Sequence, residues 1–185
     1  VDTGGTHGSG CTLSSAVAAR LARGETVESA VEGASAYLER AVRYAVDVGG
    51  GARPVHGMVG VRNRAGLADA SEAVAETVAA FVDRDVSPLV PAVGMNVVGP
   101  PAYAETVDDV VALDGRLRRT LDGVAPARGV RAGASSHVAR FLLAAREFDP
   151  SLRFAVNCRY DDDVEAALSS LPWSVARYDR RDQPD

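Results

Sequence analysis

The sequence contains no lysine. All 20 basic residues are arginine, and 25 acidic residues outnumber them to give a net charge of −5. This balance argues against a protein that binds nucleic acid through nonspecific charge attraction. Lysine depletion with an excess of aspartate, as in Asp161-Asp162-Asp163, is typical of salt-adapted proteins encoded by GC-rich genomes. GC bias alone produces the same composition, so both explanations stay open.

Aromatic residues, cysteines and long apolar runs are also scarce. Aromatics form 5% of the chain, so a core must be built mainly from valine, alanine and leucine. Without a run of about 18 apolar residues we expect no membrane-spanning helix, and no secretory signal pattern is visible. Cys11 and Cys158 lie far apart in the sequence and form no metal-type pair. A reduced, cytoplasmic protein is therefore favoured over a disulfide-bonded one.

Hydrophobic periodicity predicts helices and strands that alternate along much of the chain. The expected helices cover about 12–24, 26–45, 70–82, 136–148 and 161–170, and the expected strands cover 90–98, 109–113, 153–158 and 173–178. Residues 52–70 show no clean period, and a Gly- and Arg-rich stretch covers 115–133. This alternation predicts an α/β fold with a mixed or parallel sheet. The expected division is a first domain at 1–57, a linker at 58–72 and a second domain at 73–185.

The first motif is a glycine-rich turn that leads into a helix. It reads Thr6-His7-Gly8-Ser9-Gly10-Cys11-Thr12. Glycines let the backbone present successive N–H groups, and the helix start adds partial positive charge, so the turn suits a phosphoryl group. Cys11 would lie in the first turn, where a helix start favours the thiolate and lets it act as a base. Taken alone, a plain helix-entry turn is the commoner explanation of such a pattern.

The second motif joins arginines to a polar helix start. Its two parts read Asp114-Gly115-Arg116-Leu117-Arg118-Arg119 and Gly133-Ala134-Ser135-Ser136-His137-Val138-Ala139-Arg140. Ser135, Ser136 and His137 would bring hydroxyls, free N–H groups and an imidazole to a phosphate or pyrophosphate. Arg116 and Arg119 would supply bidentate charge to the same anion. A serine that only caps the helix and a histidine that only lies on the surface explain the pattern equally well.

The run 161–163 is expected to be an acidic helix start rather than a metal site, and no metal-ligand cluster is predicted elsewhere.

Asp2-Thr3 and the segment 6–14 resemble the C-terminal signature of hydroxymethylpyrimidine kinases of the ribokinase-like superfamily. The resemblance implies that Cys11 is the catalytic base toward the substrate hydroxyl and that Gly8, Ser9, Gly10 and the backbone of Cys11 bind the phosphate. ATP would be the co-substrate. Most of that family's domain would precede this chain, so we expect the sequence to be a fragment.

Residues 73–178 resemble the archaeal, ThiN-type thiamine-phosphate synthase domain. The segments that carry the resemblance are Val86-Ser87-Pro88-Leu89-Val90-Pro91, Gly94-Met95-Asn96, Gly115-Arg116, 133–139 and Ala155-Val156-Asn157-Cys158-Arg159-Tyr160. It implies activity roles for Arg116 and His137 and a Mg²⁺-assisted reaction. That reaction joins hydroxymethylpyrimidine diphosphate to thiazole phosphate and releases pyrophosphate. The implied fold is the helical tail of a ribokinase-like domain followed by a three-layer, mixed-sheet α/β domain truncated at its C-terminus.

Three functions remain open at this point. The first is a bifunctional enzyme of thiamine biosynthesis, cytoplasmic and homo-oligomeric, that acts on small molecules and contacts neither nucleic acid nor membrane. The second is a sensor that binds thiamine phosphate without catalysis. The third is a synthase-like domain that only supports assembly of the kinase.

Overall fold

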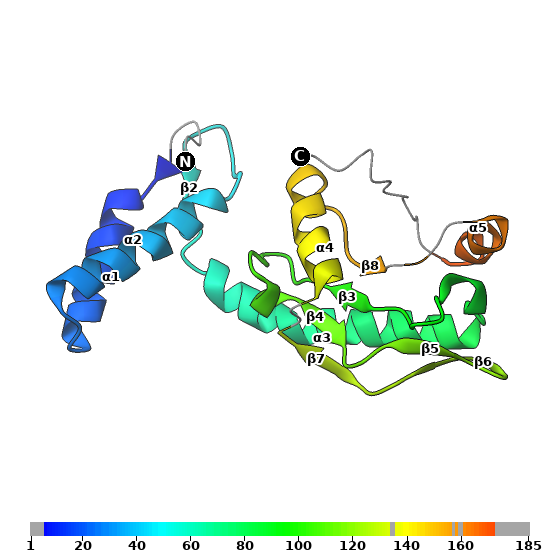
Figure 1. The fold of residues 1–185 in the computed structure, drawn as a ribbon. Coiled ribbons are helices and arrows are strands. Elements are labelled where there is room, and N and C mark those ends of the chain that lie inside the picture. The colour runs from blue at the N-terminus through cyan, green and yellow to red at the C-terminus, as the bar shows by residue number, and fades with distance from the viewer. Residues whose placement is uncertain (1–5, 134–135, 157, 159–160, 173–185) are drawn as a thin grey trace. The chain divides into compact units, whose positions relative to one another are not determined.

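The computed structural model describes residues 6–133, 136–156, 158 and 161–172 (Figure 1). The chain divides into two compact units, Val1–Arg64 and Ala65–Asp185, which we call unit 1 and unit 2. Each unit is described by itself. None of the described helices combines the length and the hydropathy that a bilayer span requires.

Unit 1 is a pair of helices beside a short parallel strand pair. Strand β1 (Thr6–His7) pairs with β2 (Arg53–Pro54), and helices α1 (Ser9–Ala22) and α2 (Val27–Arg43) lie between them in the chain. Both predicted helices are confirmed, although α1 begins three residues earlier than expected. Thr26 caps α2 by accepting a hydrogen bond from the N–H of Ser29 at 3.2 Å.

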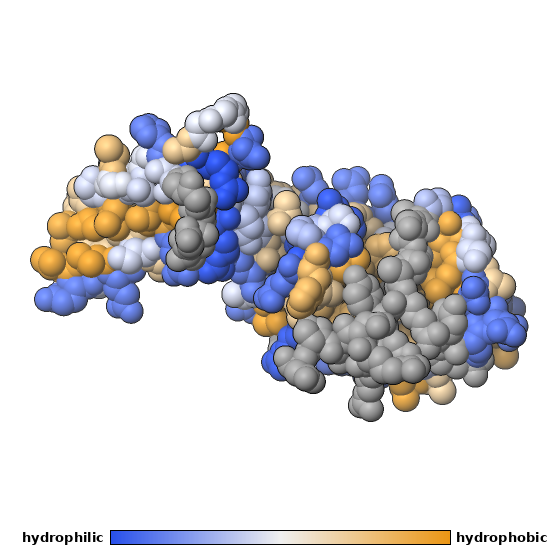
Figure 2. Space-filling model, turned by 90° about the horizontal axis from the view of Figure 1, so that it is seen from above, coloured by the Kyte–Doolittle hydropathy of each residue, from blue (hydrophilic) through white to orange (hydrophobic). Residues whose placement is uncertain are grey.

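The helices of unit 1 bury only small side chains. Three alanines of α2 are buried, and α1 has no buried residue. Leu21, Val27 and Val31 are exposed by 41%, 61% and 47%. Figure 2 shows the resulting apolar band over these helices.

The stretch expected to be a linker, 58–72, is helical. Helix α3 runs unbroken over Val59–Asp83, so the predicted third helix begins about 11 residues earlier than expected. Glycine weakens a helix by about 1 kcal/mol relative to alanine, which obscured the pattern around Gly60 and Gly66. Gly66 is useful in this helix because a Cβ there would lie 3.2 Å from the Cβ of Pro101.

The larger sheet of unit 2 has the order β7-β4-β3-β8. Its strands are β7 (Val130–Ala132), β4 (Val111–Leu113), β3 (Val97–Gly99) and β8 (Ala155–Val156). All three described pairings are antiparallel. The predicted α/β class is confirmed, and the described part of the sheet is antiparallel where a mixed or parallel one was expected. The connection from β3 to β4 contains no α-helix, whereas parallel neighbours need a crossover connection that is usually helical.

Helices cover both faces of this sheet, as the three-layer prediction requires (Figure 1). Successive strand residues face opposite sides. Val97, Val111 and Leu113 belong to one buried cluster with Val74, Val78 and Phe81 of α3. Val98 and Ala112 belong to a second cluster with Val138 and Leu142 of helix α4 (His137–Phe148). At Gly99 a Cβ would lie 2.9 Å from Cγ2 of Val74, so α3 crosses the sheet at a position that leaves no room for a side chain.

The remaining elements of unit 2 surround this core. They are the hairpin β5 (Leu117–Thr120) and β6 (Gly123–Pro126), the 3₁₀ turns η1 (Ser87–Leu89) and η2 (Val107–Asp109), and helix α5 (Asp162–Ser169). Helices α4 and α5 confirm the predictions for 136–148 and 161–170. The strand predicted for 90–98 is reduced to β3, because Pro91 and the left-handed Gly94 (φ +83°) interrupt it. The predicted strand 173–178 lies outside the described residues.

Candidate anion sites in the two units

The predicted phosphate-binding residues of unit 1 lie in one turn at the start of α1. Gly8 is the N-cap residue, with a left-handed backbone (φ 87°, ψ 2°) and no side-chain capping bond. The N–H of Thr12 closes the first turn on the carbonyl of Gly8 at 2.9 Å. The preceding N–H groups, those of Ser9, Gly10 and Cys11, have no acceptor within the helix. The turn therefore presents backbone donors in the arrangement that binds phosphate.

The backbone of unit 1 holds this turn in place. β1 precedes it and pairs with β2, and the N–H of Val55 donates to the carbonyl of His7 at 3.2 Å. A Cβ at Gly8 would meet only Cγ2 of Val55, at 3.9 Å, so the backbone conformation rather than space favours glycine there. Cys11 is exposed and unoxidised on the first turn, so its thiol can reach a bound molecule.

In unit 2, two segments that carry the sequence resemblance lie side by side. Met95 and Leu117 exchange backbone hydrogen bonds of 2.8 and 2.9 Å. Gly94 allows this approach, because a Cβ there would lie 3.0 Å from both the Cβ of Arg116 and the carbonyl oxygen of Leu117. The segments Gly94-Met95-Asn96 and Gly115-Arg116, remote in the chain, therefore form one surface.

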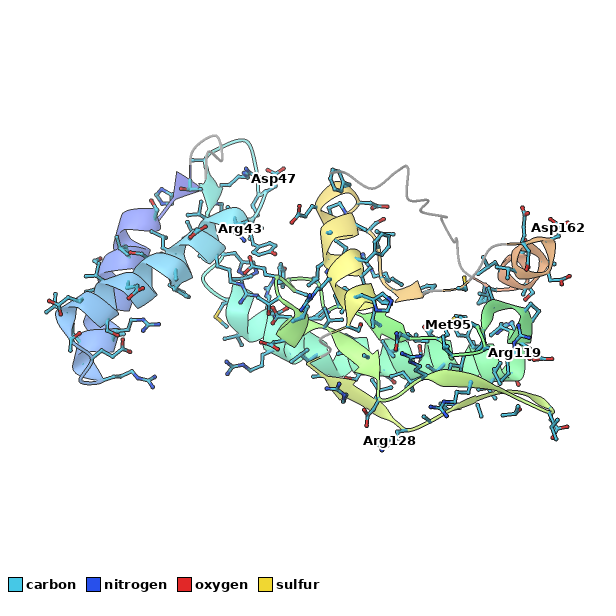
Figure 3. The ribbon with its side chains drawn as sticks, viewed as in Figure 1. Arg43, Asp47, Met95, Arg119, Arg128 and Asp162 are labelled. Carbon is cyan, nitrogen blue, oxygen red and sulfur yellow. The ribbon has the colours of Figure 1, made fainter. Side chains whose placement is uncertain are left out.

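Arg116 and Arg119 both contact the loop that precedes Gly94, and Figure 3 shows Arg119 on the hairpin. Nη1 of Arg116 donates to the carbonyl of Val93 at 2.6 Å, and Nε of Arg119 donates to the carbonyl of Val90 at 2.8 Å. A guanidinium carries five N–H donors, so each group keeps donors beyond these bonds. Positive charge is thus held beside this loop in a defined orientation, as binding of a diphosphate requires.

His137 is the first residue of α4 and is exposed. Ser136 caps the helix, its Oγ accepting from the N–H of Ala139 at 3.1 Å. Ser135 lies outside the described residues. The N–H of Gly133 bonds to the carbonyl of Val110, which places the approach to α4 near the start of β4. Arg116 follows the other end of that strand, and among the described residues no direct contact joins it or Arg119 to His137.

An ion-pair network that the sequence did not suggest connects these segments. The carboxylate of Asp114 accepts from Nη1 of Arg128 at 3.4 Å and from Nε of Arg131 at 3.2 Å. Nη1 of Arg131 also donates to the carbonyl of Gly133 at 2.8 Å. The pairing of β4 with β7 creates this network, and the Gly- and Arg-rich sequence gave no strand signal there.

The described residues of unit 2 form neither a reactive cysteine nor a metal site built from protein side chains. Burial, followed by the nearby Asp161 carboxylate, raises the pKa of the Cys158 thiol, which keeps it protonated at neutral pH. Within the described ranges no group of three or more His, Cys, Asp or Glu residues is arranged to hold a metal ion. Mg²⁺ commonly binds through one or two carboxylates plus substrate phosphates, so a preformed protein cage is not required for it.

A cavity of about 450 Å³ lies elsewhere in unit 2. Its walls are mostly apolar and include Val78 and Val82 of α3, Pro126 of β6 and Val130 of β7, with Arg128 beside them. None of the residues predicted for the anion site lines it.

Two family models match different parts of the chain. The family model described as thiamine-phosphate synthase ThiN matches residues 73–185, and the model described as phosphomethylpyrimidine kinase matches residues 1–56. A bifunctional thiamine biosynthesis protein ThiDN of Methanocaldococcus jannaschii is 28% identical over 181 residues, which cover 96% of this chain and 41% of that protein.

Two further relatives each match one part. A thiamine-phosphate synthase ThiN of Methanothermobacter thermautotrophicus is 34% identical over 101 residues, covering 55% of this chain and 53% of its own length. A hydroxymethylpyrimidine/phosphomethylpyrimidine kinase of Streptomyces coelicolor is 48% identical over 58 residues, covering 31% of this chain and 22% of its own length. The chain thus spans about half or less of each of these relatives.

Proposed function

Because the chain belongs to the thiamine-phosphate synthase ThiN family through residues 73–185, we propose that unit 2 carries a thiamine-phosphate synthase site. The reaction joins hydroxymethylpyrimidine diphosphate to thiazole phosphate. The carbon–oxygen bond to the diphosphate breaks, pyrophosphate leaves with the electron pair, and the thiazole nitrogen forms the new bond to carbon. The observation that carries this proposal is the meeting of segments 94–96 and 115–119, which sets two arginines beside one loop.

Arg116 and His137 are the residues we assign to the synthase reaction. The Arg116 guanidinium, oriented by the carbonyl of Val93, stabilises negative charge that grows on the leaving pyrophosphate. Arg119 adds charge from the same hairpin. His137, with the free N–H groups at the start of α4 and the hydroxyls of Ser135 and Ser136, binds the same diphosphate from its other side. Mg²⁺, when bound with the diphosphate, neutralises further phosphate charge.

For unit 1 we propose the last part of a kinase site for hydroxymethylpyrimidine and its phosphate. The match to the phosphomethylpyrimidine kinase family over residues 1–56 supports this. The N–H groups of Ser9, Gly10 and Cys11 hold the phosphoryl group that ATP transfers, and Gly8 provides the turn. The Cys11 thiolate takes the proton of the attacking substrate hydroxyl. For both activities we predict a cytoplasmic, homo-oligomeric protein that is adapted to high salt.

The synthase test uses the full reading frame that encodes this chain, incubated with hydroxymethylpyrimidine diphosphate, thiazole phosphate and Mg²⁺ in high KCl. Thiamine phosphate is measured by chromatography. We expect product from the wild type and from Arg84→Ala, a control at an exposed arginine after α3, and loss of product in Arg116→Ala and His137→Ala. A folded wild type that binds thiamine phosphate but makes none is instead a sensor. One that binds no pathway compound has only an assembly role.

The kinase test compares the two cysteines in the same protein. We expect Cys11→Ala to abolish ATP-dependent phosphorylation of hydroxymethylpyrimidine phosphate and Cys158→Ala to leave it unchanged, because Cys158 lies in the other unit. Equal activity in both variants contradicts the role assigned to the Cys11 thiolate.

A further inference from the structure

Two glycines with a left-handed backbone form the turns that precede Arg116 and the start of α4, the two parts of the proposed synthase site. Gly115 (φ +92°) immediately precedes Arg116, and Gly133 (φ +79°) begins the segment that leads to Ser136 and His137. A Cβ at Gly115 would lie 2.8 Å from the Cβ of Ala127, so this turn tolerates no side chain. The positions of these two turns decide how Arg116 and His137 meet the same substrate.

One side chain contacts both turns. Arg131 is the middle residue of β7, opposite Ala112 of β4. Its Nε bonds to Oδ1 of Asp114, the residue directly before Gly115, at 3.2 Å, and its Nη1 bonds to the carbonyl of Gly133 at 2.8 Å. Because the guanidinium is planar and rigid, these two contacts fix the distance between their partners.

Backbone hydrogen bonds hold the partners of Arg131 in turn. The N–H of Asp114 donates to the carbonyl of Gly129 at 2.8 Å, and the N–H of Gly133 donates to the carbonyl of Val110 at 3.0 Å. Arg131 therefore bridges two turns whose backbones are already held by hydrogen bonds.

The exposure of the network means that its loss should cost unit 2 little stability, so an effect on the site can be measured separately. The side chains of Arg131 and Asp114 are 55% and 35% exposed, and ion pairs with this exposure contribute little to stability. Arg128 shares the Asp114 carboxylate at 3.4 Å but is 76% exposed, and its described bonds do not reach Gly133. Arg128 thus offers a matched comparison, with the same carboxylate partner but without the bridge.

We propose that Arg131 is a positioning residue of the synthase site, which keeps the Arg116 turn and the His137 helix start at the spacing that the reacting diphosphate needs. This inference rests on the proposed synthase function. Arg131 itself need not touch the substrate. Its effect passes through Asp114 and Gly133.

The kinetic test compares Arg131→Met with Arg128→Met in the full-length protein. We expect Arg131→Met to lower kcat at least about tenfold, with KM for the diphosphate changed less than about twofold, because each half keeps its own binding groups while their alignment is lost. Arg131→Lys should recover only part of the rate, since one ammonium does not reproduce the fork. Arg128→Met should stay within about twofold of wild type.

Amide hydrogen exchange supplies a readout that does not depend on activity. In Arg131→Met the N–H groups of Gly133 and Ala139 should exchange faster, and in Arg128→Met they should match the wild type. Wild-type exchange and wild-type kcat in Arg131→Met overturn the inference. A wild type without synthase activity refutes the proposed function, while the exchange comparison still decides whether Arg131 positions these segments.

Discussion

Unit 1 and unit 2 bury apolar surface to very different extents. In unit 2, buried clusters lie on both sides of the sheet, and the one on the α3 side contains fully buried side chains as large as Phe81, Leu89 and Met95. The buried apolar residues described in unit 1 are three alanines of α2 and Val59. Because the hydrophobic contribution grows with the buried apolar area, unit 2 carries most of the stabilisation that this chain gains from burial.

The two proposed sites differ in the same way. The turn of unit 1 depends on backbone geometry at Gly8 and on free N–H groups, with few large side chains beneath it. In unit 2, Leu117 lies between Arg116 and Arg118 in the sequence and is fully buried. Its side chain therefore connects the surface that carries Arg116 to the packed core. We therefore expect core substitutions to damage unit 2 strongly, whereas changes in unit 1 should act mainly through local backbone features.

The largest effect is expected from core truncation. Phe81→Ala should lower the free energy of unfolding of unit 2 by about 3–5 kcal/mol, because it leaves a cavity in a fully buried cluster. Leu21→Ala in α1, where the side chain is 41% exposed, should cost less than about 1 kcal/mol. Urea denaturation followed by circular dichroism measures both. Equal losses would contradict the difference between the units.

The next largest effect on stability is expected from crowding at β3. Gly99→Ala should cost about 1–3 kcal/mol, since the new Cβ would lie 2.9 Å from Val74 and 3.1 Å from the carbonyl oxygen of Arg153. Gly60→Ala in α3 meets no atom within 4 Å and should stabilise the helix by about 0.5–1 kcal/mol. Thermal melts of the two variants should shift in opposite directions. A shift in the same direction argues against the close approach of α3 to β3.

The helix caps allow a comparison between the units with matched chemistry. Ser136 caps α4 at 3.1 Å, and Thr26 caps α2 at 3.2 Å. Replacing either by alanine should cost about 1 kcal/mol. The same denaturation curves test this, and Ser14→Ala, an exposed serine within α1, is the control. A cap in unit 1 that costs nothing would show that α2 is not part of its cooperative unfolding.

The smallest effect is a pH dependence in unit 2. The raised pKa of Cys158, caused first by burial and then by Asp161, means that the folded state favours the neutral thiol. The unfolded thiol ionises first, at about pH 8.5. The stabilisation is therefore complete below that pH and is lost as pH rises through the folded pKa. Unfolding free energies measured from pH 7 upward should fall more steeply for wild type than for Cys158→Ala. Parallel curves would contradict the shift.

Local signals in the sequence predicted the helices well. Thr26, Ser136 and Asp161 each cap the helix that they were expected to begin, and their side chains accept the bonds that this role requires. Such caps are decided within three residues, so no tertiary information is needed. Helix α3 was only partly predicted, because its glycines lower local helix propensity and burial against the sheet offsets that cost.

Strand pairing and the site of unit 2 could not be derived in the same way. The Gly- and Arg-rich stretch contains β5, β6 and β7. β6 pairs locally with β5, but Leu117 of β5 pairs with Met95, and β7 pairs with β4 across the intervening hairpin. Arg131 gains its contacts only once β7 lies beside β4. Arg116 and Arg119 were predicted as a pair and do share one loop. Their relation to His137 stays a prediction.

Strand β7 forms one edge of the described four-stranded sheet. An edge strand is a template on which a second molecule can extend the sheet, and natural proteins discourage this with short strands and charged side chains. β7 has three residues, and its middle residue is Arg131. The arginine that bridges two turns therefore also marks a strand edge that resists intermolecular pairing.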